Sequence, residues 1–402
     1  YILTGTLISC LGVLFFFKYF NFVSQSVSEV LRLFAIQTHP ITLNLLLPVG
    51  ISFYTFQTLS YVIDVYRGEV PAERHFGYYA AFISFFPQLV AGPIERTRNL
   101  LPQIKAQYEF DYTQASYGLK LMAWGFFKKL CVADVLAVYV DAAYSSLHTQ
   151  TGFALLFAIF GFTIQIYCDF SGYSDIAIGT AKLFGIELMT NFDSPYFSCS
   201  IKEFWFRWHI SLSTWFRDYV YIPLGGNRCG KLKHSANLLI TFLVSGLWHG
   251  ASWTFVIWGG IHGAAQIIEN IFAKPLRQFR KTKAGHLLLW GTTFVFCSLA
   301  WTFFRADTFS DALYVISHAL DGVTGGRRYF SNPIGLRSYE YIKIGGLVSI
   351  LALYDFMSLK TDVIAWITGK NILLRWTTYT ALIFIIFLFA NIGNNSFIYF
   401  QF

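Results

Sequence analysis

The sequence predicts an all-α protein, a polytopic transmembrane bundle of about nine to eleven membrane segments. Three observations predict this class: 55% of the 402 residues are hydrophobic and 19% aromatic, only 13% are charged, and long stretches carry no charge. Soluble domains carry roughly 25% charged residues. Because the chain has 43 Phe and 11 Trp, it cannot be a disordered chain, a collagen-like repeat or a small disulfide scaffold.

Uncharged windows mark the expected spans in chain order, because about 20 mostly apolar residues cross a hydrocarbon core of roughly 30 Å. Seven windows lack Asp, Glu, Lys and Arg: residues 1–17, 38–63, 76–94, 142–168, 235–268, 284–304 and 376–402. Four weaker apolar segments contain or directly adjoin isolated charges: residues 27–36, 117–139, 176–188 and 344–354. The window at 235–268 is long enough for a helical pair.

We expect a single membrane domain over residues 1–402, because no internal repeat or low-complexity tract divides the chain. The absence of a repeat also argues against an inverted-repeat transporter. The chain begins at Tyr1, and no basic signal-peptide region precedes the first window. We therefore expect it to lack some N-terminal segments of a longer protein.

The net charge of +8 arises from short basic connectors between apolar segments. Such links are typical of cytoplasmic loops that face anionic lipid, so membrane lipid is an expected partner. Nucleic acid is not expected, because its binding would gather basic and stacking aromatic residues on one exposed domain. The connectors contain Arg228, Lys231 and Lys233, and then Lys274, Arg277, Arg280, Lys281 and Lys283.

The six cysteines, at positions 10, 131, 168, 199, 229 and 297, form no CxxC pair and show no regular spacing. This pattern indicates neither a thiolate zinc site nor a disulfide framework. We expect buried packing residues.

The stretch at residues 169–217 is too polar for a lipid-facing span and too aromatic for a solvated loop. We expect re-entrant or interfacial helices that line an interior cavity. Ser200 can cap a helix on which His209, Ser213 and Arg217, spaced by four, share one side and hold an anionic or polar ligand. An interfacial helix anchored by Trp and Arg would give the same pattern. Turn residues IPLGGN, at 222–227, end the element.

His249 is unusual because it lies in the longest charge-free window, with only His262 as an ionisable neighbour there. At bilayer depth an imidazole needs a partner or a cavity, which favours a functional role over packing. Small residues nearby would let backbones or a thin ligand approach, although they also serve ordinary helix packing. They are Gly246, Gly250, Gly259 and Gly260.

Two histidines are compatible with several chemistries. A metal site would need a third ligand at recognisable spacing, and the sequence has no HExxH motif and no acids flanking His209 or His249, so we expect no metal. General-base activation of a hydroxyl or thiol needs one neutral imidazole, which a partly buried histidine supplies. Acyl transfer fits this inventory best.

Several motifs resemble the membrane-bound O-acyltransferase family. The most specific is FWFRWHISLSTWFRDY at residues 204–219, followed by IPLGGN. Further matches are LPVGISFYTF at 47–56, FFPQLVAGPI at 85–94, DFSGYSD at 169–175 and SGLWHG at 245–250. Together they resemble the bacterial branch of the alginate and peptidoglycan O-acetyltransferase membrane subunits. The teichoic acid D-alanyl transfer protein is a more distant relative in this resemblance.

The resemblance implies a central tunnel across the bilayer, with His249 at the active-site histidine and His209 at a second characteristic polar position. Cytoplasmic acetyl-CoA, or an acyl carrier protein, would present a thioester there as co-substrate, without any permanently bound cofactor. His249 would be the general base, and His209 with Arg217 would orient donor or acceptor. Asp218 would pair with a nearby cation. Further substrate-binding positions are Ser213, Trp208, Trp248 and Asp169.

The chain end FIYFQF, at residues 397–402, also resembles this branch, and Tyr399 is its only hydroxyl side chain. An acyl-tyrosine intermediate would split the transfer into two steps if a base activates the phenol, whose ordinary pKa is about 10. The alternative is an aromatic residue at the membrane interface.

The resemblance further implies a multi-pass protein of the bacterial cytoplasmic (inner) membrane that supplies acetyl groups for O-acetylation of an extracytoplasmic polysaccharide, alginate-like or peptidoglycan. A periplasmic or membrane-anchored SGNH-type acetyltransferase would complete the transfer. The residues alone leave three rivals open. They are a transporter or flippase for an acylated or glycan precursor, a scaffolding subunit indifferent to His249→Ala, and a metalloenzyme that a chelator inactivates.

Overall fold

The computed structural model describes residues 1–150, 152–329, 336–393 and 397–398, and the regular structure of these residues is entirely helical. The all-α prediction is therefore confirmed. Five helical segments in the described part of the chain are long and apolar enough to cross a membrane. They are Ile2–Leu33, Gly152–Leu183, Lys283–Arg305, Ser338–Ser358 and Ile372–Phe389.

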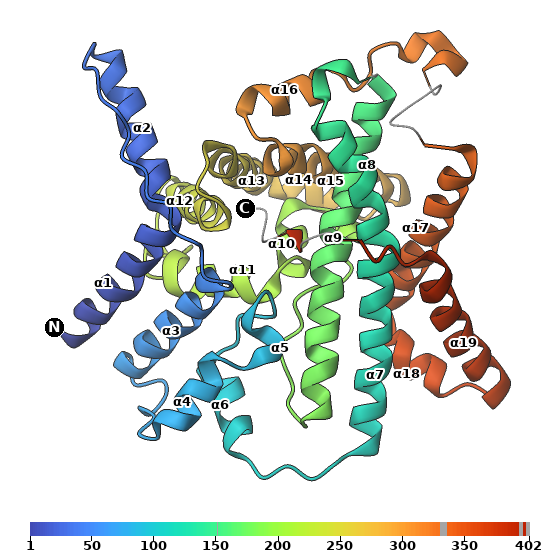
Figure 1. The fold of residues 1–402 in the computed structure, drawn as a ribbon, viewed down its shortest axis with the longest axis horizontal. Coiled ribbons are helices and arrows are strands. Elements are labelled where there is room, and N and C mark those ends of the chain that lie inside the picture. The colour runs from blue at the N-terminus through green and yellow to red at the C-terminus, as the bar shows by residue number, and fades with distance from the viewer. Residues whose placement is uncertain (151, 330–335, 394–396, 399–402) are drawn as a thin grey trace.

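The N-terminal helices form one side of the molecule (Figure 1). The first segment is continuous through a π-helical turn, and four shorter helices follow an irregular stretch. The uncharged window at 76–94 is not one span: Ser84 ends one helix, and Pro87 lies in the first turn of the next. The elements are α1 (Ile2–Leu14), η1 (Phe15–Tyr19), α2 (Phe20–Leu33), α3 (Ile51–Tyr66), α4 (Phe76–Ile83), α5 (Phe86–Leu89) and α6 (Thr97–Lys105).

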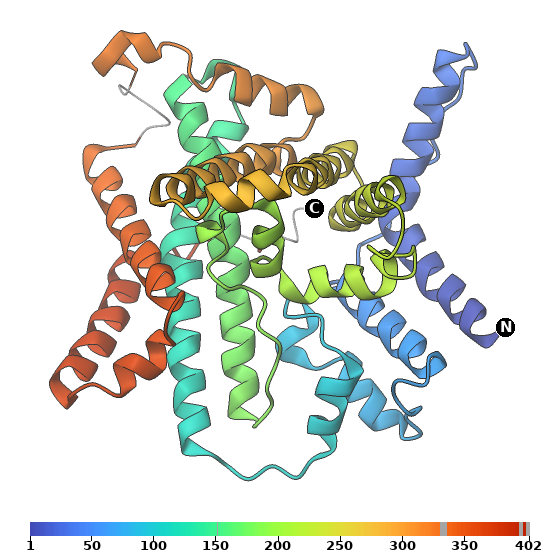
Figure 2. The same cartoon turned by 180° about the vertical axis from the view of Figure 1, so that it is seen from behind.

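The longest helices form a central pair. α7 (Tyr112–Phe126), π-helical η2 (Phe127–Ala133) and α8 (Asp134–Tyr144) continue one another and pack along α9 (Gly152–Leu183), as Figures 1 and 2 show. Glycine makes this approach possible, because a Cβ on Gly118 would lie 2.5 Å from the Gly179 carbonyl oxygen. α9 joins most of the predicted segments at 142–168 and 176–188 into one helix, whereas residues 142–144 belong to α8.

Charged side chains inside the central pair are neutralised by ion pairs. Lys128 Nζ on η2 lies 2.5 Å from Asp175 on α9. Lys129 Nζ lies 2.5 Å from Asp169 and 2.8 Å from Asp134. Ionisable groups within membrane helices are tolerated when they pair with one another. The isolated charges in the weaker predicted segments are thus compatible with membrane helices.

The later helices surround two short interior ones, α10 and α11, which lie near the middle of the molecule in both views (Figures 1 and 2). The predicted pair at 235–268 is confirmed as α12 and α13. The elements are η3 (Leu147–Thr149), η4 (Pro195–Phe197), α10 (Ile201–Arg207), α11 (Ile210–Phe216), η5 (Arg217–Tyr221), α12 (Lys231–His249), α13 (Trp253–Ile271), α14 (Ala273–Phe279), α15 (Lys283–Arg305), α16 (Phe309–His318), η6 (Val323–Arg328), α17 (Ser338–Ser358), α18 (Val363–Thr368) and α19 (Ile372–Phe389).

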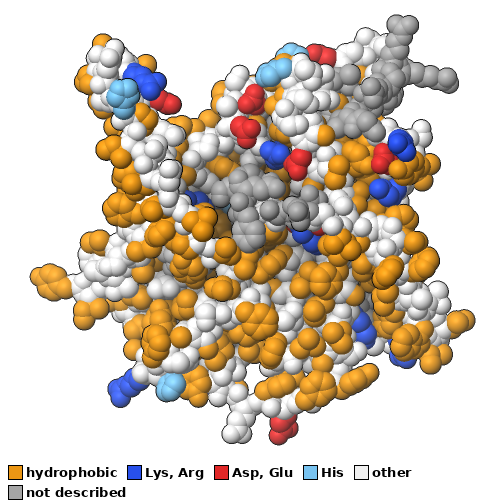
Figure 3. Space-filling view, in the orientation of Figure 1, with side chains coloured by type: hydrophobic (Ala, Val, Ile, Leu, Met, Phe, Trp, Pro, Cys, Tyr) orange, Lys and Arg blue, Asp and Glu red, His pale blue; other side chains and the backbone are white. Residues whose placement is uncertain are grey.

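The outer surface is strongly apolar. α19 buries none of its residues within the protein. Figure 3 shows hydrophobic side chains over most of the lower half of one face, where charged side chains are few. Exposed apolar area on this scale is typical of a surface that contacts lipid.

The cysteine prediction is confirmed for four of the six residues. Cys131, Cys168, Cys199 and Cys297 are buried, whereas Cys10 and Cys229 are partly exposed, and all six are free thiols.

Candidate active site

The polar stretch that was expected to form one helix is broken at His209. Ser200 does cap α10, because its Oγ accepts a hydrogen bond from the Glu203 N–H at 3.0 Å. α10 then ends at Arg207, and α11 starts only at Ile210. The Ile210 N–H donates instead to the Asn191 carbonyl oxygen at 2.9 Å, outside the helix. This external bond explains why a continuous helix is wrong here.

The break turns His209 away from Ser213 and Arg217. His209 has a left-handed backbone, with a φ of 43°, which is uncommon for a residue with a side chain and tends to occur at functional sites. Its side chain has no exposed surface, whereas Ser213 and Arg217 line a pocket. The prediction that all three share one side of a helix is therefore wrong.

Asn191 holds the His209 ring and decides its tautomer. The Asn191 Oδ1 accepts hydrogen bonds from the Ser211 hydroxyl at 2.9 Å and the Ser211 N–H at 3.3 Å. His209 Nδ1 lies 3.1 Å from the same oxygen, so Nδ1 carries the proton and donates it. His209 Nε2 is then a lone pair, and it has no hydrogen-bond partner among the described residues. A buried, unprotonated nitrogen of this kind can accept a hydrogen bond from a substrate.

His249 is the last residue of α12, and only 4% of its surface is exposed. Its ring centroid lies 6.4 Å from that of His209, so the structure brings the two predicted histidines together. Trp258 and Phe304 pack on the His249 ring at 5.2 and 5.3 Å, and Phe170 packs on the His209 ring at 4.6 Å. The two imidazoles thus share an aromatic interior, where electrostatic interactions are stronger than in water.

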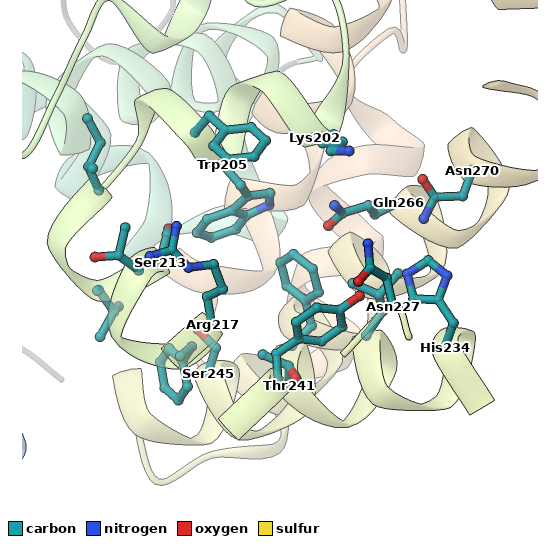
Figure 4. A pocket seen from close by; sticks show the side chains of 18 residues that line it. Lys202, Trp205, Ser213, Arg217, Asn227, His234, Thr241, Ser245, Gln266 and Asn270 are labelled. Atoms are coloured by element: carbon teal, nitrogen blue, oxygen red, sulfur yellow. The ribbon is translucent and has the colours of Figure 1, made fainter. Parts of the chain in front are cut away.

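A pocket of about 330 Å³ opens between α10, α11 and η5 on one side and α12 and α13 on the other. Figure 4 shows Ser213 and Arg217 on one wall, opposite Gln266 and Asn270. Ser245, one turn before His249, lies at the wall formed by α12. None of the lining residues, all of which belong to the described part of the chain, is acidic, whereas three carry basic groups: Lys202, Arg217 and His234.

Arg217 is partly neutralised. Its Nε lies 2.8 Å from one oxygen of Asp218, and Arg96 lies 3.0 Å from the other oxygen. The prediction that Asp218 pairs with a nearby cation is therefore confirmed. Arg217 remains half exposed and can still present its guanidinium to the pocket.

Three further predicted residues, Trp208, Trp248 and Asp169, do not line the pocket. Trp208 and Trp248 are buried, and the Trp248 ring lies 6.1 Å from that of His209. Asp169 pairs with Lys129 and accepts a hydrogen bond from the Ile398 N–H at 2.7 Å. Tyr399 lies outside the described residues. Asp169 thus ties the chain next to that tyrosine to α9.

Two residues of the site were missed by the sequence analysis. Asn191 lies within the polar stretch at residues 169–217 that was expected to line an interior cavity, but no motif distinguishes it from the other polar residues there. Lys18 is the single charged residue among positions 1–28, and the high cost of a charge in an apolar segment was a usable signal. Its Nζ donates to the carbonyl oxygens of Trp248 and His249.

No three His, Cys, Asp or Glu side chains cluster as metal ligands in the residues that the structure describes. The site is therefore described by its histidines, its aromatic walls and the basic pocket alone.

Comparison with known proteins places this site within a family. Residues 73–306 match the family model for the membrane-bound O-acyltransferase family. That range contains both histidines, Asn191 and every residue that lines the pocket.

Individual relatives agree with the match. The chain is 45% identical over 297 residues to the probable alginate O-acetylase AlgI of Azotobacter vinelandii, covering 74% of this chain and 58% of that protein. It is 38% identical over 347 residues to the peptidoglycan O-acetyltransferase of Helicobacter pylori, covering 79% and 64%. It is 27% identical over 289 residues to the teichoic acid D-alanyltransferase of Bacillus subtilis, covering 70% and 71%. The chain therefore spans less than two thirds of the length of the first two relatives.

Proposed function

The chain belongs to the membrane-bound O-acyltransferase family, and on that premise we propose that it moves acetyl groups from a cytoplasmic thioester to an extracytoplasmic polysaccharide. Relatives named for alginate and peptidoglycan O-acetylation support this acceptor class. The observation that carries the proposal is the pair of buried imidazoles, His209 and His249, 6.4 Å apart beside a basic pocket.

His249 acts as the general base in this reaction. The accepting hydroxyl oxygen attacks the thioester carbonyl carbon while its proton passes to the imidazole. The carbon–sulfur bond then breaks, and the imidazolium returns the proton to the leaving thiolate. The single proton of the attacking hydroxyl goes to His249, so His209 accepts a hydrogen bond through its Nε2 lone pair from another N–H or O–H group of the substrate and so orients that substrate. The aromatic walls of the interior limit the access of competing water.

The basic pocket is the entry for the donor. Lys202, Arg217 and His234 line it without any acidic residue among the described lining residues, which suits the phosphate groups of coenzyme A. Acetyl-CoA is therefore the proposed co-substrate, and an acyl carrier protein is the other thioester source of this chemistry. Ser213 and Arg217 contact the donor, and Trp208 and Trp248 wall the path to the histidines.

Tyr399 is proposed as a covalent acyl carrier. Support comes from the two described residues that precede it in the sequence. Asp169 accepts a hydrogen bond from the Ile398 N–H, and the ring of Phe397 lies 6.1 Å from that of Phe170, which packs on His209. A phenol ester would hold the acetyl group between the donor step and the acceptor step.

The proposed setting is the bacterial inner membrane. We propose one membrane domain over residues 1–402, with about nine to eleven membrane segments around a tunnel that crosses the bilayer. A periplasmic or membrane-anchored SGNH-type acetyltransferase receives the acetyl group and completes the transfer to the glycan. A transporter or flippase without acyl chemistry is less well supported, because the relatives are named as acyl- or alanyltransferases.

The test uses the chain in nanodiscs with acetyl-CoA radiolabelled in the acetyl group, together with the partner and glycan. We expect His249→Ala to lower donor turnover by at least about 10³-fold, because the base is lost. Tyr399→Phe should abolish covalent label on the protein. The matched control is His39→Ala, which removes an exposed histidine and should leave turnover unchanged.

Each other outcome contradicts a defined part of the proposal. Full turnover in His249→Ala would indicate a scaffolding subunit. Inhibition by a chelator would indicate a metalloenzyme. Label that survives Tyr399→Phe would place the acyl carrier elsewhere. An absence of donor turnover in every form would reject acetyl-CoA as the donor.

A further inference from the structure

Lys18 is a membrane-embedded cation whose side chain reaches the end of the helix that carries His249. It lies on η1, within the apolar N-terminal segment Ile2–Leu33. Its Nζ donates to the Trp248 carbonyl oxygen at 2.7 Å, to the His249 carbonyl oxygen at 3.0 Å and to the Ser52 Oγ at 3.3 Å. The three hydrogen atoms of the ammonium are thus all used.

The carbonyl groups that Lys18 contacts are those that a helix leaves without intrahelical partners. α12 ends at His249, because Gly250 is extended, with φ of −156° and ψ of 149°. The last four carbonyls of a helix lack such partners and carry a partial negative charge. A cation is the favourable group at this end. Lys18 therefore caps the C-terminus of α12, although it lies 230 residues away from Trp248 in the sequence.

No carboxylate forms an ion pair with Lys18 in the part of the chain that the structure describes. Its neighbours are the two carbonyls, the Ser52 hydroxyl and the Trp248 ring, whose centroid is 5.9 Å from Nζ. A charge in an apolar segment is costly, and an unpaired one is usually retained for a function. We therefore infer that the role of this lysine is to bind the carbonyl groups at the end of α12.

The π-helical turn explains how Lys18 reaches inward from a helix that faces lipid. Such turns insert one residue into an α-helix and are frequent at functional sites. Phe15 and Phe16, on the same turn, are 37% and 54% exposed. The turn therefore leaves aromatic rings outside while it directs the ammonium to α12.

We propose that Lys18 is a positioning residue for His249: it holds the last turn of α12 and thereby sets the orientation of the imidazole for proton transfer. The proposal rests on the proposed function, because His249 is the base only in that function. It assigns the N-terminal helix α1–η1–α2 a part in the active site.

The first experiment measures steady-state acetyl transfer by the full chain in nanodiscs with its partner. We expect Lys18→Met to lower kcat at least about tenfold, because loss of orientation affects the chemical step. The dissociation constant for a non-reactive thioether analogue of acetyl-CoA should stay within about twofold. Lys18→Arg, which keeps the charge and reach, should recover most of kcat. Arg32→Met, an exposed cation on α2, is the matched control and should match the wild type.

The second experiment measures the chemical accessibility of the His249 imidazole and does not depend on turnover. Diethyl pyrocarbonate modifies neutral imidazoles, and mass spectrometry gives the rate at His249 relative to the exposed His39. We expect Lys18→Met to raise this ratio at least about threefold as the last turn loosens, and Lys18→Arg to keep it near the wild-type value. If Lys18→Met is not recovered as folded protein, Lys18→Gln, which keeps a donor without the charge, is judged by the same thresholds.

The outcomes separate the two proposals. An inactive wild type overturns the proposed function, and the modification ratio still decides the role of Lys18. An unchanged ratio and a kcat within about twofold of wild type in Lys18→Met overturn the positioning role. Equal loss in Lys18→Met and Lys18→Arg, with weakened analogue binding, would show a purely structural lysine and overturn it as well.

Discussion

Glu95 is a carboxyl group with no exposed surface, in the connection between α5 and α6. One oxygen accepts a hydrogen bond from Asn99 Nδ2 at 2.7 Å, and the other accepts one from the Met189 N–H. Burial raises the pKa of Glu95 to about 7, against the lowering effect of these bonds. The residue beside it, Ile94, donates its N–H to Ser211 Oγ at 3.0 Å. Glu95 is thus next in the chain to Ile94, whose bond to Ser211 reaches a hydrogen-bond partner of Asn191.

The raised pKa of Glu95 predicts a pH dependence of stability. Its ordinary value is 4.5 and its value in the folded protein is about 7. The stabilisation is therefore complete below pH 4.5 and is lost as the pH rises toward 7, because the unfolded chain ionises first. The loss is roughly 3 kcal/mol, at about 1.4 kcal/mol per pKa unit. Apparent melting temperature in detergent, measured from pH 4 to 8, checks this.

Substitution identifies the group responsible. Glu95→Gln cannot ionise, so we expect its melting temperature to vary less with pH across this window than that of the wild type. Glu29→Gln, at an exposed position on α2, should keep the wild-type slope. An identical slope in Glu95→Gln and wild type would assign the pH dependence to another group.

At the scale of the element, α12 carries His249 at its end and packs closely against α13. Their backbones meet at Gly246 and Gly259, where an added Cβ would lie 2.2 Å from the carbonyl oxygens of Phe255 and Phe242, respectively. The proposed role of small residues is therefore confirmed at these two positions. Gly260 differs, because its Cβ would meet only the Leu243 side chain, at 3.4 Å.

Adjacent glycines on α13 give a matched test of this contact. Gly259→Ala should lower stability by about 1–3 kcal/mol, because backbone atoms must move to admit the methyl group. It should also reduce acetyl transfer, because α12 carries His249 at its end. Gly260→Ala should leave stability within about 1 kcal/mol of wild type. Melting temperature and transfer rate of both variants check the prediction, and equal effects would contradict it.

At the scale of the whole molecule, basic side chains occur both in the pocket wall and in the links next to the helices that form it. Lys202 and Arg217 line it, and the links before α12 and around α14 add further Lys and Arg residues. Basic links of this kind stay on the cytoplasmic side of a membrane. This rule predicts that the pocket mouth lies on the cytoplasmic side, where the proposed thioester donor is found.

Sidedness can be measured by labelling. We expect Lys281→Cys, in the exposed link before α15, to react with a membrane-impermeant maleimide at least about tenfold more in inverted than in right-side-out vesicles. The partly exposed native thiols are removed by Cys10→Ser and Cys229→Ser, and that parent protein without Lys281→Cys sets the background. Preferential reaction in right-side-out vesicles would contradict a cytoplasmic pocket.

The sequence by itself determined the helical membrane class and the family, and it proposed His209 and His249 as candidate site residues. Apolar composition with uncharged windows leaves few other architectures, and the family motifs are contiguous, so both are readable from neighbouring residues. The helical pair α12 and α13 and the cap at Ser200 were predictable for the same reason.

Only the tertiary structure decided where the chain breaks and what holds the site. His209 leaves the predicted helix because Ile210 bonds to Asn191, and residues 76–94 divide at a turn. Asn191 and Lys18 act on groups 18 and 231 residues away, His209 and His249. A local pattern reports the neighbours of a residue along the chain, whereas these contacts arise when distant segments pack together and their polar groups must find partners in a dry interior.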